Sequence, residues 1–292
     1  MLSSIKTVTS ASSCLDRVDW LKEQIQLADY ILIGAGAGLT AAAGLDYAGE
    51  DFRREFREWT ERYGMTDLYS SGFYPFNSEE ERWAYWAKHI WFCRYRTGAL
   101  PLYRQLLRLV AGKDYFVVTT NVDGQFGMAG FDSRRIFALQ GDYAYFQPAS
   151  GAPKVLYHNE AWVEKALPLI EDCRIPPELI PRTPDGLPVA AHLRCDGTFV
   201  EDAHWHEQAQ HYSDFVARAH DKRLLLLEFG VGFSTPVIIR FPFEQMAARF
   251  PYTTLVRFNR DYPQLLTLGI SRFVAFREDL PELFRLESRA IN

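Results

Sequence analysis

Residues 30–45 read YILIGAGAGLTAAAGL, and this stretch decides the fold. The apolar run at 30–33 predicts a buried strand, the glycines after it predict a tight turn, and the alanine-rich end predicts a helix. Free N–H groups at the start of such a helix suit a pyrophosphate, and glycine lets the backbone approach it closely. The stretch therefore predicts a strand–turn–helix unit for a dinucleotide, although the glycines could serve the turn alone.

Strand and helix patterns alternate through most of the remaining chain. Helices are expected over 15–27, 51–63, 78–96, 101–110 and 204–219, after Pro236 and from Leu280. Further strands are expected over 115–119, 135–139, 223–229, 253–258 and 272–276. Such alternation is typical of a parallel sheet with helices on both faces.

Between Asp142 and Trp205 the sequence is rich in proline, which excludes long helices over much of that segment. We therefore predict an α/β fold in which a Rossmann-like parallel-sheet domain carries a smaller lobe formed by two insertions. The large domain comprises residues 1–45, 100–141 and 204–292, and the small lobe comprises 46–99 and 142–203.

Composition excludes several classes of protein. The chain has 292 residues, of which 48% are hydrophobic, so it can bury a sizeable core and is not a disordered segment. Its net charge is −5 without long runs of one sign, which argues against a nucleic-acid partner. No apolar run is long enough to span a bilayer and the start lacks the apolar core of a signal peptide, so we expect a soluble, cytoplasmic protein without membrane contact.

Four predicted strand ends carry unusual residues, at 34–38, 120–123, 139–141 and 230–235. Ligands of parallel sheets bind at these ends. Asn121 and Asp123 together offer donors and acceptors to a carboxamide, although such a pair also caps helices. Gly36, Gly38 and Ala41 fit the G-x-G-x-x-A pattern of nicotinamide and flavin oxidoreductases. That fold needs a second strand with an acidic end about 20 residues later, where this chain has a charged helix instead.

Five ordered motifs make the chain similar to the sirtuin family over nearly its whole length. They are GAGLTAAAGL at 36–45 followed by DFR at 51–53, TTNVD at 119–123, LQG at 139–141, GVGFS at 230–234 with Pro236, and VRFN at 256–259. Sirtuins are NAD-dependent enzymes that modify proteins. The resemblance implies the same α/β fold and NAD as the cofactor.

The resemblance also implies a role for each matched residue. Phe52 and Arg53 belong to a loop that closes over NAD, Asn121 and Asp123 contact the nicotinamide carboxamide, and Asn259 lies on the adenosine side. The implied NAD-binding residues are Gly36, Ala37, Gly38, Thr40, Phe52, Arg53, Thr120, Gly230, Ser234 and Asn259, and the implied catalytic residues are Asn121, Gln140 and Asp123.

One departure from the family decides the predicted activity. Sirtuins that remove acyl groups carry a catalytic histidine where this chain has Gln140, and they usually carry glutamine where it has Thr120. A glutamine amide does not titrate near neutral pH, so it cannot take a proton from the nicotinamide ribose. Loss of nicotinamide from C1′ does not need that base. We therefore expect ADP-ribosyl transfer to a protein nucleophile rather than deacylation.

The second departure concerns zinc. Sirtuins usually place two C-x-x-C pairs in the small lobe, but here Thr183 and Gly186 stand near the expected positions of one pair and the segment 145–147 has no cysteine. The four cysteines are Cys14, Cys93, Cys173 and Cys195, far apart in the sequence. We expect a degenerate zinc-ribbon-like segment without a metal, although His158, Cys173, His192 and Cys195 could in principle form an irregular site.

These departures, with the insertion before Asp51, are similar to the macrodomain-linked sirtuins of microbial pathogens. That subgroup implies mono-ADP-ribosylation of a lipoyl-carrying protein similar to the glycine cleavage H protein, and a macrodomain hydrolase as a functional partner that reverses the modification. Two rival functions stay open. One is an NAD-dependent protein-lysine deacylase in which another group replaces the histidine, and the other is a non-catalytic NAD-binding sensor.

Overall fold

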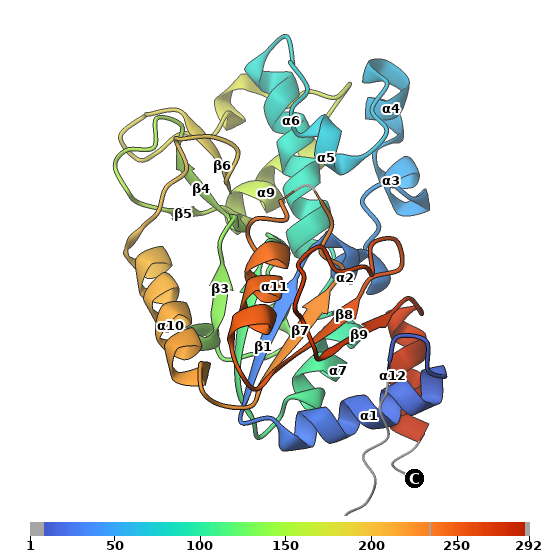
Figure 1. Cartoon of the computed structure of the whole chain (residues 1–292). Helices are drawn as coiled ribbons and strands as arrows, with labels where there is room; N and C mark the ends of the chain where they lie inside the picture. Colours follow the sequence, from blue (N-terminus) through green and yellow to red (C-terminus); the bar gives the residue numbers. More distant parts are fainter. Residues whose placement is uncertain (1–8, 234, 290–292) are drawn as a thin grey trace, which may run out of the picture.

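The computed structural model describes residues 9–233 and 235–289, and its main body is a six-stranded parallel sheet (Figure 1). The strands lie in the order β3-β2-β1-β7-β8-β9. Their bounds are Tyr30–Ala35 for β1, Asp114–Thr119 for β2, Ile136–Ala138 for β3, Leu224–Phe229 for β7, Thr253–Phe258 for β8 and Phe273–Phe276 for β9. This confirms the predicted Rossmann-like fold class.

The strand order places a crevice at the middle of the sheet. From β1 the chain builds outward to β3, and it later returns to the other side of β1, where Tyr30 pairs with Leu224 and Ala35 with Phe229. The carboxyl ends of β1 and β7 are therefore neighbours. The chain after β1 continues to β2 on one side of this pair, and the chain after β7 continues to β8 on the other side. In open parallel sheets this is the place where ligands bind.

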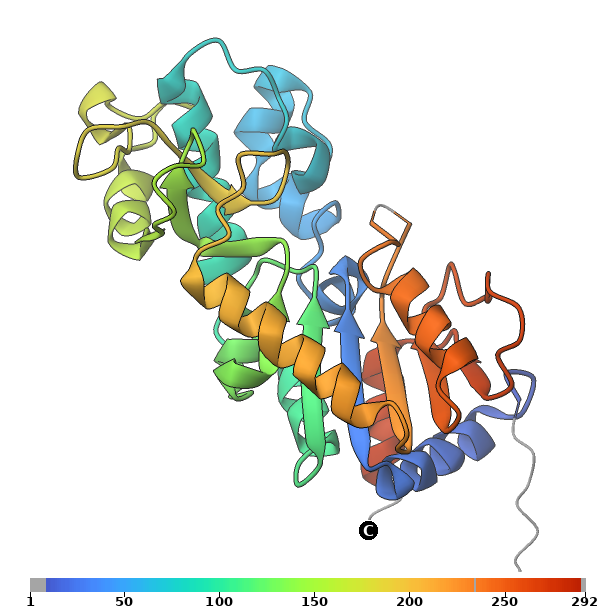
Figure 2. The same cartoon turned by 60° about the vertical axis from the view of Figure 1, so that its left-hand side comes forward.

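Helices cover both faces because side chains alternate along each strand. Ile31 and Ile33 pack against α1 (Cys14–Leu27), α7 (Pro101–Leu109) and α12 (Leu280–Arg289), whereas Leu32 faces α10 (Ala203–Ala219) and α11 (Arg240–Arg249) (Figure 2). The short α2 (Ala37–Ala42) follows β1, and α8 (Gln125–Met128) follows β2.

A smaller lobe stands above the carboxyl ends of the large sheet (Figures 1 and 2). It contains a three-stranded antiparallel sheet in the order β5-β4-β6, with β4 at Gly141–Pro148, β5 at Tyr157–His158 and β6 at Val189–Leu193. Its helices are α3 (Glu50–Glu55), α4 (Arg57–Tyr63), α5 (Leu68–Ser71), α6 (Glu79–Ile90) and α9 (Glu160–Ala166). Short 3-10 turns lie at Leu167–Leu169 and Pro177–Leu179 in this lobe, and another at Ser133–Arg135 precedes β3 in the large domain.

Two helices of this lobe differ from the sequence expectation in detail. Residues 51–63 form α3 and α4, separated at Phe56, whose backbone leaves the helical region at φ −110° and ψ 25°. The Ser78 hydroxyl caps α6 by accepting the N–H of Glu81 at 3.3 Å, a common role of serine before the first residue of a helix. The final turn of the expected helix is a π-helix at Trp91–Tyr95, a wider turn that local periodicity does not reveal.

Aromatic packing and one polar side chain, that of Gln147, hold the small lobe together. The rings of Trp83, Phe146 and Trp162 meet edge to face at 5.0–5.6 Å. The Gln147 amide donates to the Thr198 carbonyl at 2.9 Å and accepts the Val200 N–H at 3.0 Å, which fastens the loop after β6.

The four residues considered for an irregular metal site have separate surroundings. Cys173 is buried in the core of the lobe, the His192 ring stacks on Phe199 at 4.6 Å, and Cys195 and His158 are exposed. Across residues 9–233 and 235–289, no three His, Cys, Asp or Glu side chains gather as metal ligands would. In the same ranges no helix combines the length and apolar character that crossing a bilayer requires.

Candidate functional site

A cavity of about 980 Å³ opens at the carboxyl ends of β1, β2, β7 and β8, beneath the small lobe. Its volume is at the upper end of the range for small-molecule sites. From the large domain it is lined by the turns after these strands, including Gly36, Ala37, Gly38, Thr120, Asn121, Gln140, Gly230 and Asn259. These eight residues belong to the set that the sequence analysis assigned to the site.

The glycines at this edge let two strand ends approach each other. The Gly38 N–H donates to the Gly230 carbonyl at 3.0 Å, and a Cβ on Gly38 would lie 2.8 Å from the Gly230 Cα. Gly230 has φ +58°, and a Cβ there would meet the Leu39 nitrogen at 2.3 Å. Side chains at either position would push the two turns apart. The glycines thus serve the packing of the turns as well as the floor of the cavity.

One backbone donor in this turn is free for a ligand. Ala37 is exposed on the cavity surface and is the first residue of α2, so its N–H has no partner within the helix. Within the described residues it donates to no other protein acceptor either. An exposed amide beside a floor of glycines is the kind of surface that accepts a phosphate oxygen.

Asn121 is held from behind by a buried hydrogen-bond network. Its amide nitrogen donates to the Gly36 carbonyl at 3.1 Å, the Thr40 hydroxyl at 3.1 Å and the Tyr103 hydroxyl at 3.3 Å. The Thr40 hydroxyl donates in turn to Asp123 at 2.6 Å. The nitrogen is therefore occupied, and the side-chain oxygen, which has no partner in the described part of the chain, is left to accept a hydrogen bond from a ligand.

Asp123 lies behind the cavity surface rather than on it. Its side chain is 1% exposed, and its other oxygen accepts the Gln125 N–H at 3.0 Å, at the start of α8. Asp123 thus binds the first N–H of α8 from just before the N-cap residue, Gly124. Burial raises the pKa of Asp123, while the hydrogen bonds from Thr40 and Gln125 oppose that rise.

Gln140 occupies the junction between the two sheets. It lies in the two-residue turn between β3, which ends at Ala138, and β4, which begins at Gly141, so the chain passes from the large sheet to the small one at this point. Its carbonyl accepts the Arg194 N–H at 2.9 Å, and the Arg194 side chain donates to the Leu139 carbonyl at 3.3 Å. The half-buried Gln140 side chain lines the cavity and has no hydrogen-bond partner among the residues described.

At the far end of the cavity, Asn259 is used by the protein itself. Its amide nitrogen donates to the Val231 carbonyl at 2.8 Å, and its oxygen accepts the N–H groups of Asp261 and Tyr262. The fully buried Arg240 donates to the same Val231 carbonyl at 3.4 Å and to the Tyr262 carbonyl at 2.9 Å. The two loops that border this end are therefore fastened to each other.

Several residues assigned from the sequence do not reach the cavity. Thr40 is fully buried within the network behind Asn121. Phe52 packs in the core of the small lobe, where its ring stacks on Phe56 at 5.0 Å, and Arg53 is exposed on α3 away from the cavity lining. Ser234 lies outside the described residues.

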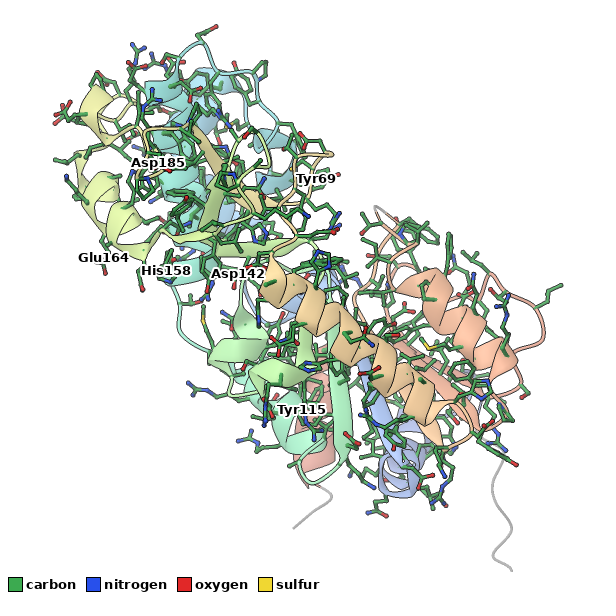
Figure 3. All side chains as sticks on the ribbon, turned by 90° about the vertical axis from the view of Figure 1, so that its left-hand side faces the viewer. Tyr69, Tyr115, Asp142, His158, Glu164 and Asp185 are labelled. Carbon is green, nitrogen blue, oxygen red and sulfur yellow. The ribbon has the colours of Figure 1, made fainter. Side chains whose placement is uncertain are left out.

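The small-lobe side of the cavity was missed by sequence reasoning. It includes Tyr47, Trp86, His89, Cys93, Tyr143, Arg194 and Cys195. His89 sits among aromatic residues on α6 and reads as part of an apolar helix face, so nothing local singles it out. Tyr69 and Phe73 form an exposed rim with ring centroids 5.7 Å apart, and Figure 3 shows Tyr69 on the edge of the lobe that borders the large domain.

Comparison with known proteins gives relatives along most of the chain. A protein named "Protein ADP-ribosyltransferase" from Staphylococcus aureus is 31% identical over 265 residues, covering 90% of this chain and 84% of its own length. A "Probable bifunctional ADP-ribose hydrolase/ADP-ribosyltransferase" from Fusarium oxysporum is 32% identical over 259 residues, covering 85% of this chain but only 42% of that protein. No family model matches the sequence.

Solved structures confirm the architecture. A Sir2 homologue in complex with NAD has a TM-score of 0.56 at 15% identity, with 98% of each chain covered. A structure described as the structural basis of sirtuin substrate affinity has a TM-score of 0.60 at 16% identity, covering 94% of this chain and 98% of its own. At such low identities the likeness establishes the fold alone.

Proposed function

This chain belongs to the family of protein ADP-ribosyltransferases with a sirtuin fold, and from that premise we propose that it transfers one ADP-ribose from NAD to a lipoyl-carrying acceptor protein. The observation that carries the choice of transfer over deacylation is Gln140, an uncharged amide on the cavity surface at the position where deacylating sirtuins have histidine.

The large domain presents to the cavity groups that suit each part of NAD. The free Ala37 N–H and the glycine floor suit the diphosphate, and the closely fastened turn at Val231 and Asn259 suits the adenosine end. The Asn121 side-chain oxygen is an acceptor for the carboxamide N–H of nicotinamide. Thr40 and Asp123 support Asn121 from behind. Phe52 and Arg53 do not line the cavity, and their place in a loop that closes over NAD remains part of the proposal.

In the proposed reaction the bond between C1′ of the ribose and the nicotinamide nitrogen breaks, and nicotinamide leaves with the electron pair. An acceptor atom then forms a bond to C1′ and gives up its proton to solvent. Gln140 can hydrogen-bond the ribose hydroxyls and hold C1′ in place, but its amide has no basicity with which to accept a proton. The site is thus built for positioning and for departure of nicotinamide, and it lacks the base that deacylation uses.

The cavity mouth supports an acceptor with a long apolar arm. Tyr69 and Phe73 are 70% and 58% exposed at the rim, and the lining continues inward through Tyr47, Trp86 and Tyr143. Exposed aromatic rings beside a cavity are typical of surfaces that bind another molecule. A lipoyl group on its lysine stem has the length and the apolar character to pass this rim, as in an acceptor similar to the glycine cleavage H protein.

We further propose that a macrodomain hydrolase removes the modification. The Fusarium relative supports this pairing, because its name combines ADP-ribose hydrolase and ADP-ribosyltransferase in one protein that is more than twice the length spanned by this chain. A reversible modification needs both activities in one cell.

The function is tested with NAD labelled on its adenosine half. Purified enzyme is incubated with the lipoylated H-like protein of its own organism, with the same protein lacking lipoate, and with native lysate. We expect label on the lipoylated protein only, with one nicotinamide released per ADP-ribose attached. Equal labelling without lipoate would remove the acceptor proposal, and release of nicotinamide only with acyl-lysine peptides would favour the deacylase instead.

A further inference from the structure

The small-lobe half of the cavity contains one buried polar ring in an uncharged aromatic setting. His89 is 3% exposed and lies against Trp86 and Tyr143, with ring centroids 4.9 and 5.0 Å away. All three residues line the cavity. No residue assigned from the sequence accounts for a histidine here, and the proposed reaction of NAD does not use it.

A hydroxyl contact fixes which nitrogen of the ring carries the proton. The Tyr85 hydroxyl lies 2.8 Å from His89 Nδ1 and 3.4 Å from the Leu68 carbonyl oxygen. A hydroxyl has one hydrogen, so both contacts are satisfied only if His89 Nδ1–H donates to Tyr85 and Tyr85 donates to Leu68. In that arrangement Nε2 carries a lone pair, and it has no partner within the described residues.

The charge state of the ring follows from its surroundings. Burial lowers the pKa of His89 to about 3, so the ring is neutral at physiological pH. Burial also raises the pKa of both Tyr85 and Tyr143, so these neighbours are neutral as well. A charged group packed against these rings would lose its hydration without gaining a counter-ion from them.

We propose that His89, Trp86 and Tyr143 form an acceptor subsite that binds an uncharged hydrogen-bond donor, such as a secondary amide or a hydroxyl, on an apolar stem. The donor group bonds to Nε2 of His89 while the stem packs on the two rings. Tyr85 is a positioning residue that holds the imidazole in the accepting tautomer. This inference rests on the proposed transferase function, because it assigns this half of the cavity to the acceptor and the other half to NAD.

Small probes test the subsite without knowledge of the acceptor. Binding of N-butylacetamide is measured by ligand-observed NMR on protein saturated with a non-hydrolysable carbocyclic analogue of NAD. Butyrate and butylammonium, which have similar stems but carry charges, serve as comparison probes. We expect N-butylacetamide to bind at least tenfold more tightly than either charged probe, and to remain bound in the presence of the NAD analogue.

Variants then assign the effect to the ring. His89→Phe keeps an aromatic ring but removes the acceptor, and it should weaken N-butylacetamide binding about tenfold. Tyr85→Phe keeps His89 and should reduce the preference for the amide over butyrate several-fold, which provides a test if His89→Phe does not fold. His204→Phe replaces a histidine on α10 that is exposed and outside the cavity lining, and it should bind the probe as the wild type does.

Four results would overturn the subsite: no binding of the amide to the wild type, equal binding of all three probes, equal binding to His89→Phe, or displacement of the amide by the NAD analogue. The last result would assign the pocket to nicotinamide. Failure of the transferase proposal is a separate observation, because it is seen as absence of label on protein and does not alter probe binding.

Discussion

The side-chain amide of Asn121 donates to the hydroxyl of Thr40 at 3.1 Å, and that hydroxyl donates to Asp123 at 2.6 Å. Three residues from two strand ends thus act as one unit, of which only Asn121 reaches the cavity. The direction of the Asn121 side-chain oxygen thus depends on Thr40 and Asp123, neither of which lines the cavity. Asp123 is buried, and each of its side-chain oxygens accepts a hydrogen bond there.

We therefore expect Asn121→Ala to reduce ADP-ribosyl transfer by about 10² to 10³ while the protein stays folded, a loss typical of one positioned polar contact. Thr40→Val, which removes the hydroxyl behind Asn121, should give a smaller loss because the Gly36 and Tyr103 contacts persist. Initial rates with labelled NAD and circular dichroism check both variants. Normal transfer by folded Asn121→Ala would mean that nicotinamide is held elsewhere.

We expect Gly38→Ala to displace the glycine turns that form the floor of the cavity and so to weaken NAD binding. The added methyl would lie 2.8 Å from the Gly230 Cα, and backbone atoms on both sides would have to shift. Overpacking of this kind costs about 1–3 kcal/mol of stability, and we expect NAD affinity to fall at least tenfold. Gly127→Ala is the matched control, since a Cβ there meets nothing within 4 Å. Calorimetry with NAD should separate the two, and equal affinities would contradict the packing argument.

The stability of the protein should depend on His89 in mildly acidic solution. Its pKa is about 3 in the folded protein, against 6.5 for an unperturbed histidine, so the unfolded chain binds the proton more readily between these values. Stability from the neutral ring is complete above pH 6.5 and declines as the pH falls toward 3, by at most about 2 kcal/mol at pH 5. Urea unfolding at pH 7 and pH 5 should show a smaller decline for His89→Phe. An identical decline in both proteins would contradict the buried neutral state.

Arg240 should be needed for the loops at the adenosine end. Its side chain is fully buried and donates to the carbonyls of Val231, Tyr262 and Gln264. Arg240→Met leaves these buried carbonyls without their donor, whereas Glu228 keeps its ion pair with Arg257 at 2.7 Å, so we expect stability to fall by about 1–3 kcal/mol. Arg223→Met removes an exposed pair with Asp29 and should leave the unfolding midpoint nearly unchanged. Equal midpoints for the two variants would refute this role.

How much the sequence could predict is clear from particular residues. Strand patterns and small residues predicted that Gly36 and Gly230 follow strand ends, and in the structure they follow β1 and β7; that these two strands are neighbours at the switch point was not predicted. How deeply a residue lies behind a strand end could not be predicted in this way. The spacing places Asn121 and Asp123 at the same edge of the sheet, but it does not show which of them the start of the next helix will bury. In the structure Asp123 is the buried one, and it accepts the Gln125 N–H at the start of α8.

The small lobe was harder to predict for a different reason. Phe52, Phe56 and Trp59 recur at helical spacing and pack together in its core, so the helical period rather than the family motif decided where Phe52 lies. His89 shares a helix with Trp83 and Trp86, and its access to the cavity depends on how α6 meets β4. That contact is tertiary and has no local signature.

The central claim is that Gln140 makes this enzyme a transferase. The most direct measurement follows nicotinamide release, labelled protein and deacylated peptide in one reaction that contains NAD, lysate and several acyl-lysine peptides. For the wild type we predict labelled protein, no rise of peptide deacylation with pH near 6.5, and a marked loss of labelling in Gln140→Ala; Gln140→His should keep NAD binding and gain weak deacylation. Brisk wild-type deacylation of several peptides, with no labelled protein from any lysate, would contradict the account.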